Sequence, residues 1–441
     1  LLLVALLFLF LASLPTSVQS QEPTPHSHGF LERHIAEQTI PAFAYGGAGA
    51  RSVAALTGLT RWFTERIVDS VSASTDLLID SNDIPHIVFQ YRLNDFDATL
   101  KYGYYDGTNW QFYTVDTKRH LTNYFSFDVD KMGHVHISYC VYVPGMACDD
   151  LLYAHYDGVS WKYEVVDELG LVGQFSSIQA DDRGYPHISY IDSTNYALKY
   201  ARYDGFTWHT ETVDDSAMGA TSLALDSEGH AHIAWITRSE GTKYVYNDGV
   251  GWHGQRIGGN AFVRNFISLL VDAIDRPHVI YNDQDGLIHT YRDADIWHKE
   301  TVSNCDYMEA DYFSSALDEL DNPHVTYSHC TTKQPIYAFY DGNAWQYETP
   351  PALGSLAVDK ENRPHVTYYT YPGIVYATRV NDPGGWSALT FASYRDMNFE
   401  IYTAQGDGTN PIRRTTHGAT DYTPEFNRGA TQIAFVSTRD G

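Results

Sequence analysis

The sequence predicts an all-β fold: a seven-bladed β-propeller of four-stranded blades, followed by a truncated second propeller. Three observations predict it. A unit of about 45 residues recurs seven times, apolar and polar residues alternate in short segments rich in β-branched and aromatic residues, and turn-forming residues separate these segments. No stretch keeps a 3.6-residue period, so we expect strands rather than helices. The main propeller is assigned to residues 61–390.

The composition excludes two classes of protein. The chain of 441 residues carries 29 Lys and Arg against 55 Asp and Glu, a formal net charge of −26. A surface this acidic repels phosphate backbones, so no nucleic-acid partner is expected. Hydrophobic residues make up 43% and aromatic residues 14% of the chain, which supports a large packed core and argues against disorder.

The amino-terminal residues 1–20 predict an export signal. They form one apolar run, LLLVALLFLFLASLPTSVQS, which is shorter than a spanning helix needs and ends in small residues suited to signal peptidase. An uncleaved anchor is the alternative. A linker follows over residues 21–60, and no later segment is apolar enough to span a membrane. We therefore expect an exported protein of the extracellular space, the cell surface or the periplasm, without a membrane span after signal cleavage.

Each repeat of the propeller is expected to form four strands. In residues 176–215 these are SSIQAD, HISYID, ALKYARY and WHTETVD, separated by DDRGYP, DSTN and DGFT. An extra fourth-strand pattern, WFTERIVDS, begins at Trp62, before the first full unit. It fits the last blade and would close the ring. Trp386 also begins a candidate fourth strand there, and Trp62 fits a partial eighth blade as well, so the sequence leaves the closing strand open.

Four linked positions mark every unit. An Asp precedes a histidine by six residues, a Trp follows the histidine by 19 to 25 residues, and another Asp lies four residues before the Trp, mostly in a DGxxW turn. The histidines are His86, His136, His187, His232, His278, His324 and His365, and the DGxxW aspartates are Asp106, Asp157, Asp204, Asp248 and Asp341.

One residue of each kind per blade is typical of a scaffold. We therefore interpret both sets as structural, with each His bonding a buried Asp or a main-chain group. Histidines spaced one per blade lie too far apart for tetrahedral zinc, so no metal site is assigned. No cofactor is expected. Calcium stays open for an acidic propeller, although no EF-type loop supports it.

The two faces of such a propeller are expected to have different roles. In a blade whose first strand lines the axis, the 1–2 and 3–4 turns share one face, here called the repeat-turn face. The 2–3 loops and the connections between blades share the opposite face, here called the variable-loop face. Because recurring motifs serve the blade, a ligand is expected at the variable-loop face.

Candidate binding residues on the variable-loop face lie in a long loop of the second repeat and in connections between repeats. The stretch NCDYMEADY gathers carboxylates and aromatics, which suit a cation or a sugar, although a solvated acidic loop is the alternative. The candidates are Tyr124, Asp149, Asp150, Arg264, Asn265, Asp306, Tyr307, Glu309, Asp311 and Tyr312. Two disulfides are predicted on the same face, Cys140–Cys148 and Cys305–Cys330, each stabilising a loop by roughly 2–4 kcal/mol.

Three resemblances accompany these patterns. The Asp–His pairing resembles the structural network of WD-repeat propellers. The DGxxW turn resembles a shortened Asp-box of sialidase-type propellers, in which that turn is structural and catalysis uses three Arg, a Tyr–Glu pair and an acid Asp. The RIP signature of that family is absent here, with RIV at Arg66 the nearest text, and no Arg triad is assignable. We therefore assign no catalytic residue.

The carboxyl-terminal residues 391–441 resemble a TolB-type propeller repeat. FASYRD at Phe391 returns as FVSTRD at Phe435, and Met397 and the NRGA at Asn427 depart from the usual pattern. The resemblance implies the start of a second propeller, and resemblance to bacterial repeats implies a bacterial source. The matching residues are Arg395, Asp396, Glu400, Ile401, Tyr402, Asp407, Gly408, Arg414, Thr415, Asp421, Pro424, Ile433, Ala434 and Phe435.

The function expected from the sequence is that of an exported, non-catalytic binding propeller, which recognises a glycan or a protein through its variable-loop face. A sialidase-like glycoside hydrolase and a structural surface module are the alternatives. The sequence leaves the oligomeric state open.

Overall fold

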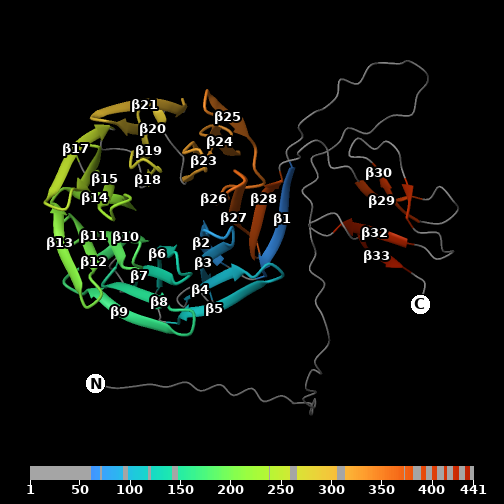
Figure 1. Ribbon diagram of the computed structural model, residues 1–441, viewed down its shortest axis with the longest axis horizontal. Coiled ribbons are helices and arrows are strands. Elements are labelled where there is room, and N and C mark those ends of the chain that lie inside the picture. The colour runs from blue at the N-terminus through green and yellow to red at the C-terminus, as the bar shows by residue number, and fades with distance from the viewer. Residues whose placement is uncertain are drawn as a thin grey trace, which may run out of the picture. The chain divides into compact units, whose positions relative to one another are not determined.

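The computed structural model describes most of the chain from Arg61 onward. The described residues are 61–69, 72–92, 98–117, 121–141, 148–237, 239–258, 266–304, 313–371, 373–380, 389–393, 400–404, 412–414, 421–426 and 433–437. Seven four-stranded antiparallel sheets surround a common axis, as the sequence predicts (Figure 1).

The first four blades follow one another along the chain. Blade one comprises β2 (Ser72–Ile79), β3 (Pro85–Arg92), β4 (Ala98–Tyr105) and β5 (Trp110–Asp116). Blade two comprises β6 (Leu121–Val129), β7 (Val135–Val141), β8 (Leu151–Tyr156) and β9 (Trp161–Asp167). Blade three comprises β10 (Val172–Ala180), β11 (Pro186–Asp192), β12 (Ala197–Tyr203) and β13 (Trp208–Asp214). Blade four comprises β14 (Ala217–Leu225), β15 (Ala231–Thr237), β16 (Thr242–Asn247) and β17 (Trp252–Gly258).

The last three blades complete the ring. Blade five comprises β18 (Ile267–Val271), β19 (Pro277–Asp283), β20 (Gly286–Asp293) and β21 (Ile296–Ser303). Blade six comprises β22 (Phe313–Leu317), β23 (Pro323–Ser328), β24 (Pro335–Tyr340) and β25 (Trp345–Glu348). Blade seven takes β26 (Ser355–Val358), β27 (Pro364–Thr370) and β28 (Gly373–Val380), and its outer strand is β1 (Arg61–Val68).

The amino-terminal strand therefore closes the ring, which answers the question that the sequence left open. β1 pairs antiparallel with β28, from Arg61 opposite Val380 to Val68 opposite Ile374. Figure 1 shows β1 beside β28, although the two strands lie at opposite ends of the propeller sequence. Pairing the first strand with the last blade removes an open sheet edge. The competing candidate, Trp386, lies outside the described residues.

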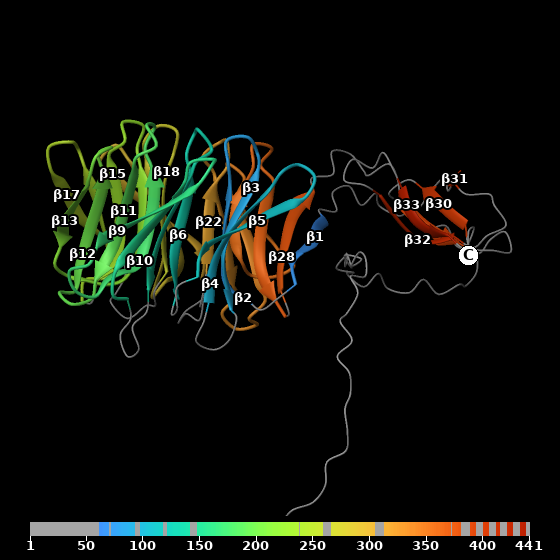
Figure 2. The ribbon, with the colours of Figure 1, turned by 90° about the horizontal axis from the view of Figure 1, so that it is seen from below.

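Burial explains why each strand takes its place. The second strand of each blade is covered on both sides by the sheets of the neighbouring blades. In β11, for example, all seven residues are buried. The fourth strands form the rim, and β13 is exposed over most of its length. Blades one to six are simple meanders, so their 1–2 and 3–4 turns leave one face of the ring and their 2–3 loops leave the other (Figure 2).

Adjacent blades are joined by an aromatic contact that repeats around the whole ring. In each case the Trp that opens a fourth strand packs edge-on against an aromatic ring of the preceding blade, with centroids 5.1 to 5.9 Å apart. The pairs are Trp110–Tyr376, Trp161–Tyr102, Trp208–Tyr153, Trp252–Tyr200, Trp297–Tyr244, Trp345–His289 and Trp62–Tyr337. Trp62 occupies the same position in blade seven as the other six do in theirs, which fits its role in closure.

The carboxyl-terminal region also forms strands. β29 (Leu389–Ser393), β30 (Glu400–Ala404) and β31 (Ile412–Arg413) make one sheet, and β32 (Asp421–Phe426) pairs with β33 (Ile433–Ser437). A second, TolB-like propeller stays a prediction. Among the residues that the structure describes, no helix has the length and apolarity of a membrane span.

Candidate functional site

The repeated histidines lie at the second position of each second strand and are held by the preceding 1–2 turn. In blade seven, Asp359 Oδ1 accepts hydrogen bonds from the backbone N–H groups of Glu361 and Arg363, at 3.0 and 2.8 Å. Asp359 Oδ2 contacts His365 Nε2 at 3.0 Å, and His365 Nδ1 contacts Tyr376 Oη. One carboxylate thus shapes the turn and orients the imidazole.

The same network recurs with two exceptions, which are the Asp–His contact of blade three and the Nδ1 partner in blade five. The contact from Asp to His Nε2 measures 3.0 to 3.5 Å in six blades. The Nδ1 partner is a Tyr hydroxyl in six blades, whereas in blade five it is His289 Nε2, at 3.0 Å from His278. Burial lowers the pKa of His187 and of His278 to about 4, so both imidazoles are neutral at pH 7.

The DGxxW aspartates are also engaged within their own turns. Asp204 Oδ1 accepts from the N–H groups of Phe206 and Thr207, at 2.8 and 2.9 Å, and its Oδ2 contacts His209 Nε2 at 2.6 Å. The hydrogen bond with His209 and those from the turn lower the pKa of Asp204. Asp106, Asp157, Asp248 and Asp341 make the same pair of backbone contacts. These contacts bond both sets of repeated residues to turns and strands of their own blades.

The glycine of this turn has a backbone reason. Gly107, Gly158, Gly205, Gly249 and Gly342 all have φ between 82° and 94°, the left-handed region that glycine adopts without strain. Blade five has Ala294 at this position, with φ 52°, so its 3–4 turn departs from the repeat.

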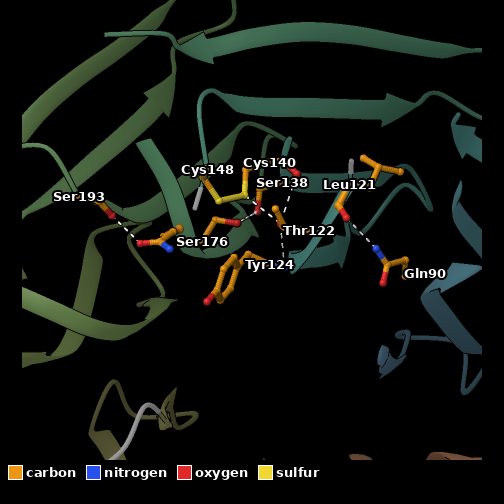
Figure 3. The surroundings of a disulfide bond; sticks show 10 residues. Gln90, Leu121, Thr122, Tyr124, Ser138, Cys140, Cys148, Ser176 and Ser193 are labelled. Atoms are coloured by element: carbon orange, nitrogen blue, oxygen red, sulfur yellow. Dashed lines mark hydrogen bonds between the residues drawn. A yellow bond between two sulfur atoms is a disulfide. The ribbon is translucent and has the colours of Figure 1, made fainter. Parts of the chain in front are cut away.

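On the variable-loop face, the Cys140–Cys148 disulfide is confirmed (Figure 3). It ties the end of β7 to the far side of the loop, with the two Cα atoms 5.7 Å apart. Asp149 follows it, and its backbone N–H donates to Val141 O at 3.1 Å while its carbonyl accepts from Val172 N at 3.4 Å. The loop base is thereby fixed to blade three.

Tyr124 lies near this disulfide, on the connection side of blade two (Figure 3). Its ring packs on Phe175 with centroids 4.6 Å apart, and its N–H donates to Thr122 Oγ1 at 3.1 Å. Burial raises the pKa of Tyr124, so the phenol is neutral at pH 7 and available as a hydrogen-bond donor. Phe175 has a positive φ of 52°, a backbone conformation that is strained for a residue other than glycine.

The remaining sequence candidates lie outside the described residues: Arg264, Asn265, Asp306, Tyr307, Glu309, Asp311 and Tyr312. Cys330 is disulfide-bonded. Its predicted partner, Cys305, falls in the same undescribed connection into blade six.

A hollow opens next to this connection, between blades five and six on the variable-loop face. Its volume is about 350 Å³. Thr301, Val302, Ser303 and Asn304 at the end of β21, Tyr327 and His329 at the end of β23, and Ile336 and Tyr347 from β24 and β25 line it. None of these eight residues is Asp, Glu, Lys or Arg, in contrast to the acidity of the whole chain.

Two side chains, His329 and Tyr347, provide this hollow with a hydrogen-bond donor and an exposed aromatic ring. His329 Nδ1 accepts from the N–H groups of Thr331 and Thr332, both at 3.3 Å, which leaves Nε2 as the N–H donor of the neutral ring. Tyr347 Oη donates to Val302 O at 2.9 Å, and 53% of the residue is exposed. The anchored hydroxyl fixes the ring, so one aromatic face is presented to solvent.

Sequence reasoning missed these lining residues because it searched for acidic and aromatic clusters in loops. Tyr347 lies on a rim strand two residues after a repeated Trp, where Tyr163 occupies the same place in blade two. His329 is preceded by a strand that obeys the repeat, and only comparison of the seven 2–3 loops distinguishes it. The signal that could have identified this site is the departure from the repeat at His329, directly after the second strand of blade six.

Neither a protein-family model nor a curated protein sequence matches the chain. Solved structures show a distant likeness, and two of them serve as examples. One is a variant of the Aleuria aurantia lectin in complex with α-methyl-L-fucoside, with a TM-score of 0.42 and 12% identity over 64% of this chain and 98% of that chain. The other is the polysaccharide lyase Uly1, with a TM-score of 0.43 and 10% identity over 79% of this chain and 94% of that chain. Likenesses at this level carry no argument about function.

Proposed function

We propose that the protein is a non-catalytic, glycan-binding propeller, and that the hollow between blades five and six is its binding site. The observation that carries the proposal is the uncharged lining of this hollow in a chain of net charge −26. A neutral ligand rich in hydroxyl groups suits such a lining. A volume of about 350 Å³ falls at the lower end of ligand sites, which suits one or two sugar rings.

The lining supplies the two kinds of contact that a saccharide needs. The ring of Tyr347 offers an apolar face for the C–H side of a sugar. The His329 Nε2–H, the Asn304 amide and the Ser303 hydroxyl offer hydrogen bonds for its O–H groups. The 2–3 loop of blade six carries the disulfide-bonded Cys330, so this wall of the hollow is held before a ligand arrives.

A glycan array on residues 21–390 tests the proposal, followed by titration of the best glycan. Tyr347→Ala is expected to weaken binding by about tenfold or more, the usual effect of removing a central aromatic contact. Tyr163→Ala is the matched control, because Tyr163 is 52% exposed and donates to Val115 O at 2.8 Å in the same manner. Equal losses in both variants, or the absence of any glycan ligand, contradict the proposal.

The alternatives give different results in the same experiments. A sialidase-like hydrolase would turn over a panel of fluorogenic glycosides, and a protein-binding or structural module would give neither turnover nor a glycan ligand. We also propose export, supported by the Cys140–Cys148 disulfide, because such bonds persist in oxidising compartments.

A further inference from the structure

A second hollow lies on the opposite, repeat-turn face, between blades four and five. Its volume is about 410 Å³. Unlike the first hollow it is lined by charged side chains: four carboxylates and two arginines, which are Arg276 from the 1–2 turn of blade five and Arg292 from the end of β20. We propose that this hollow binds an anionic group, namely the carboxylate, sulfate or phosphate of a small molecule or of an acidic saccharide.

Arg292 stands where the repeat places a tyrosine. The corresponding residues Tyr105, Tyr156, Tyr203 and Tyr340 pack on the Trp of their own blades with centroids 5.2 to 5.9 Å apart. The guanidinium of Arg292 instead lies 5.3 Å from the ring centroid of Tyr246 in blade four. Its carboxylate partner is Asp295, at 2.5 Å, whose side chain is 93% exposed. A partner in open solvent compensates little of the charge.

Blade seven provides an internal comparison, because it also carries two arginines at these positions. Arg379 corresponds to Arg292 and pairs with Glu348 at 3.1 Å, and both side chains are mostly buried. Glu348 comes from the blade that precedes Arg379, where it lies opposite Tyr337 on the fourth strand. In the blade that precedes Arg292, the equivalent residue is Gln255, which lies opposite Tyr244. The carboxylate that neutralises Arg379 is therefore absent at Arg292.

The second arginine shows the same difference. Arg363 donates through Nε to Asp359 at 2.6 Å and pairs through Nη1 with Glu361 at 3.1 Å. Arg276 also donates through Nε to its turn aspartate, Asp272, at 2.6 Å. The residue that corresponds to Glu361 is Ile274, which lines the hollow. Blade five thus keeps both guanidinium groups, whereas neither Glu361 of blade seven nor Glu348 of blade six has a carboxylate counterpart here.

The four carboxylates that line the hollow, Asp226, Glu228, Asp248 and Asp275, already have partners in the protein; Glu228 pairs with His230 at 3.5 Å. Asp275 accepts from Ser227 N and Ser227 Oγ, both at 2.7 Å. Asp248 binds its own 3–4 turn and His253. Asp226 binds its own 1–2 turn and His232. The two arginines consequently remain the groups able to take an added ligand, and a fork of N–H donors suits an oxyanion.

Isothermal titration calorimetry on the full chain tests the proposal, with sodium sulfate, galacturonate and neutral galactose as probes. Both anions are expected to bind with a Kd of about 1 mM, whereas galactose is expected not to bind. Binding of galacturonate alone would assign the site to acidic saccharides, and binding of both to oxyanions in general. No heat from either anion overturns the proposal.

Variants then locate the site. Arg292→Tyr restores the repeat residue, so it is expected to fold and to weaken anion binding by about tenfold or more. The double variant Ile274→Glu with Gln255→Glu keeps both arginines but supplies the counterparts of Glu361 and Glu348, and it is expected to abolish binding. Arg379→Gln in blade seven is the control and leaves binding unchanged. Retention of binding in both Arg292→Tyr and the double variant, or an equal loss in the control, contradicts the assignment.

Discussion

Replacing one axial aspartate by serine is expected to change how stability depends on pH. Ten residues before each repeated His, six blades carry Ser and blade one carries Asp76. The serines join first strands of neighbouring blades: Ser222 Oγ, for example, accepts from Leu269 N at 2.9 Å. Asp76 Oδ1 accepts from Leu77 N and from Ser355 Oγ, both at 3.0 Å. Blade one thus has a titratable carboxyl group, that of Asp76, where the other six blades have a neutral serine hydroxyl.

Burial raises the pKa of Asp76 from 3.8 to about 6, and the hydrogen bonds from Ser355 and Leu77 offset only part of this effect. Between pH 4 and 6 the native state therefore binds more protons than the unfolded state, so the free energy of unfolding falls as pH rises through this window. The pKa difference corresponds to about 3 kcal/mol above pH 6. Losing the hydrogen bond from Ser355 costs about 1 kcal/mol. Asp76→Ser should then stabilise the protein by about 1–2 kcal/mol at pH 8.

Urea unfolding of the wild type and of Asp76→Ser at pH 4, 5, 6, 7 and 8 measures this effect. The difference in free energy of unfolding should grow from about −1 kcal/mol at pH 4 to a gain of about 1–2 kcal/mol at pH 8. Asp76→Asn, which keeps an acceptor and removes the charge, should show the same pH dependence. Parallel curves for wild type and both variants across the whole range would refute the reasoning.

The remaining predictions concern closure, the disulfide and the turns. A Cβ at Gly373 would lie 1.7 Å from Val68 O in β1, so Gly373→Ala should separate the closing strand and lower the melting temperature, whereas Gly251→Ala, with no atom within 4 Å, should change it little. Replacing Cys140 and Cys148 together by Ser should lower the free energy of unfolding by about 2–3 kcal/mol in urea titrations, and an unchanged midpoint would contradict this. Burial alone would raise the pKa of Asp359, but hydrogen bonds from His365 and Arg363 outweigh it and lower the pKa to about 2. The stability that this group contributes, about 2 kcal/mol, is therefore present above pH 4 and lost towards pH 2, and Asp359→Asn should flatten that part of the curve.

The sequence was sufficient for the blades because their signals repeat. The alternation of apolar and polar residues, the Asp-to-His spacing and the DGxxW turn each occur in blade after blade, so one ambiguous copy is corrected by the others. Closure was not decidable, because Trp62 and Trp386 offer the same local pattern. Only the pairing of β1 with β28 over long sequence separation decides between them.

The candidate sites were harder to predict for a related reason. A binding site on a propeller is formed where residues depart from the repeat, and such a departure can be recognised only when the contacts of neighbouring blades are compared. Arg292 is an ordinary charged residue until the preceding blade is considered: Gln255 there takes the place of Glu348, the partner of Arg379. The Asp–His pairs were visible in the sequence, but their third member, the Tyr of the third strand, varies in spacing from 11 to 17 residues beyond the His.

Hydrogen–deuterium exchange with the glycan identified on the array tests the central claim most directly. The proposed function predicts that the ligand slows exchange in residues 301–304 and 327–336, on either side of the hollow between blades five and six, and leaves the repeated 1–2 and 3–4 turns unchanged. Protection confined to those repeated turns, or spread evenly over all seven blades, would contradict it.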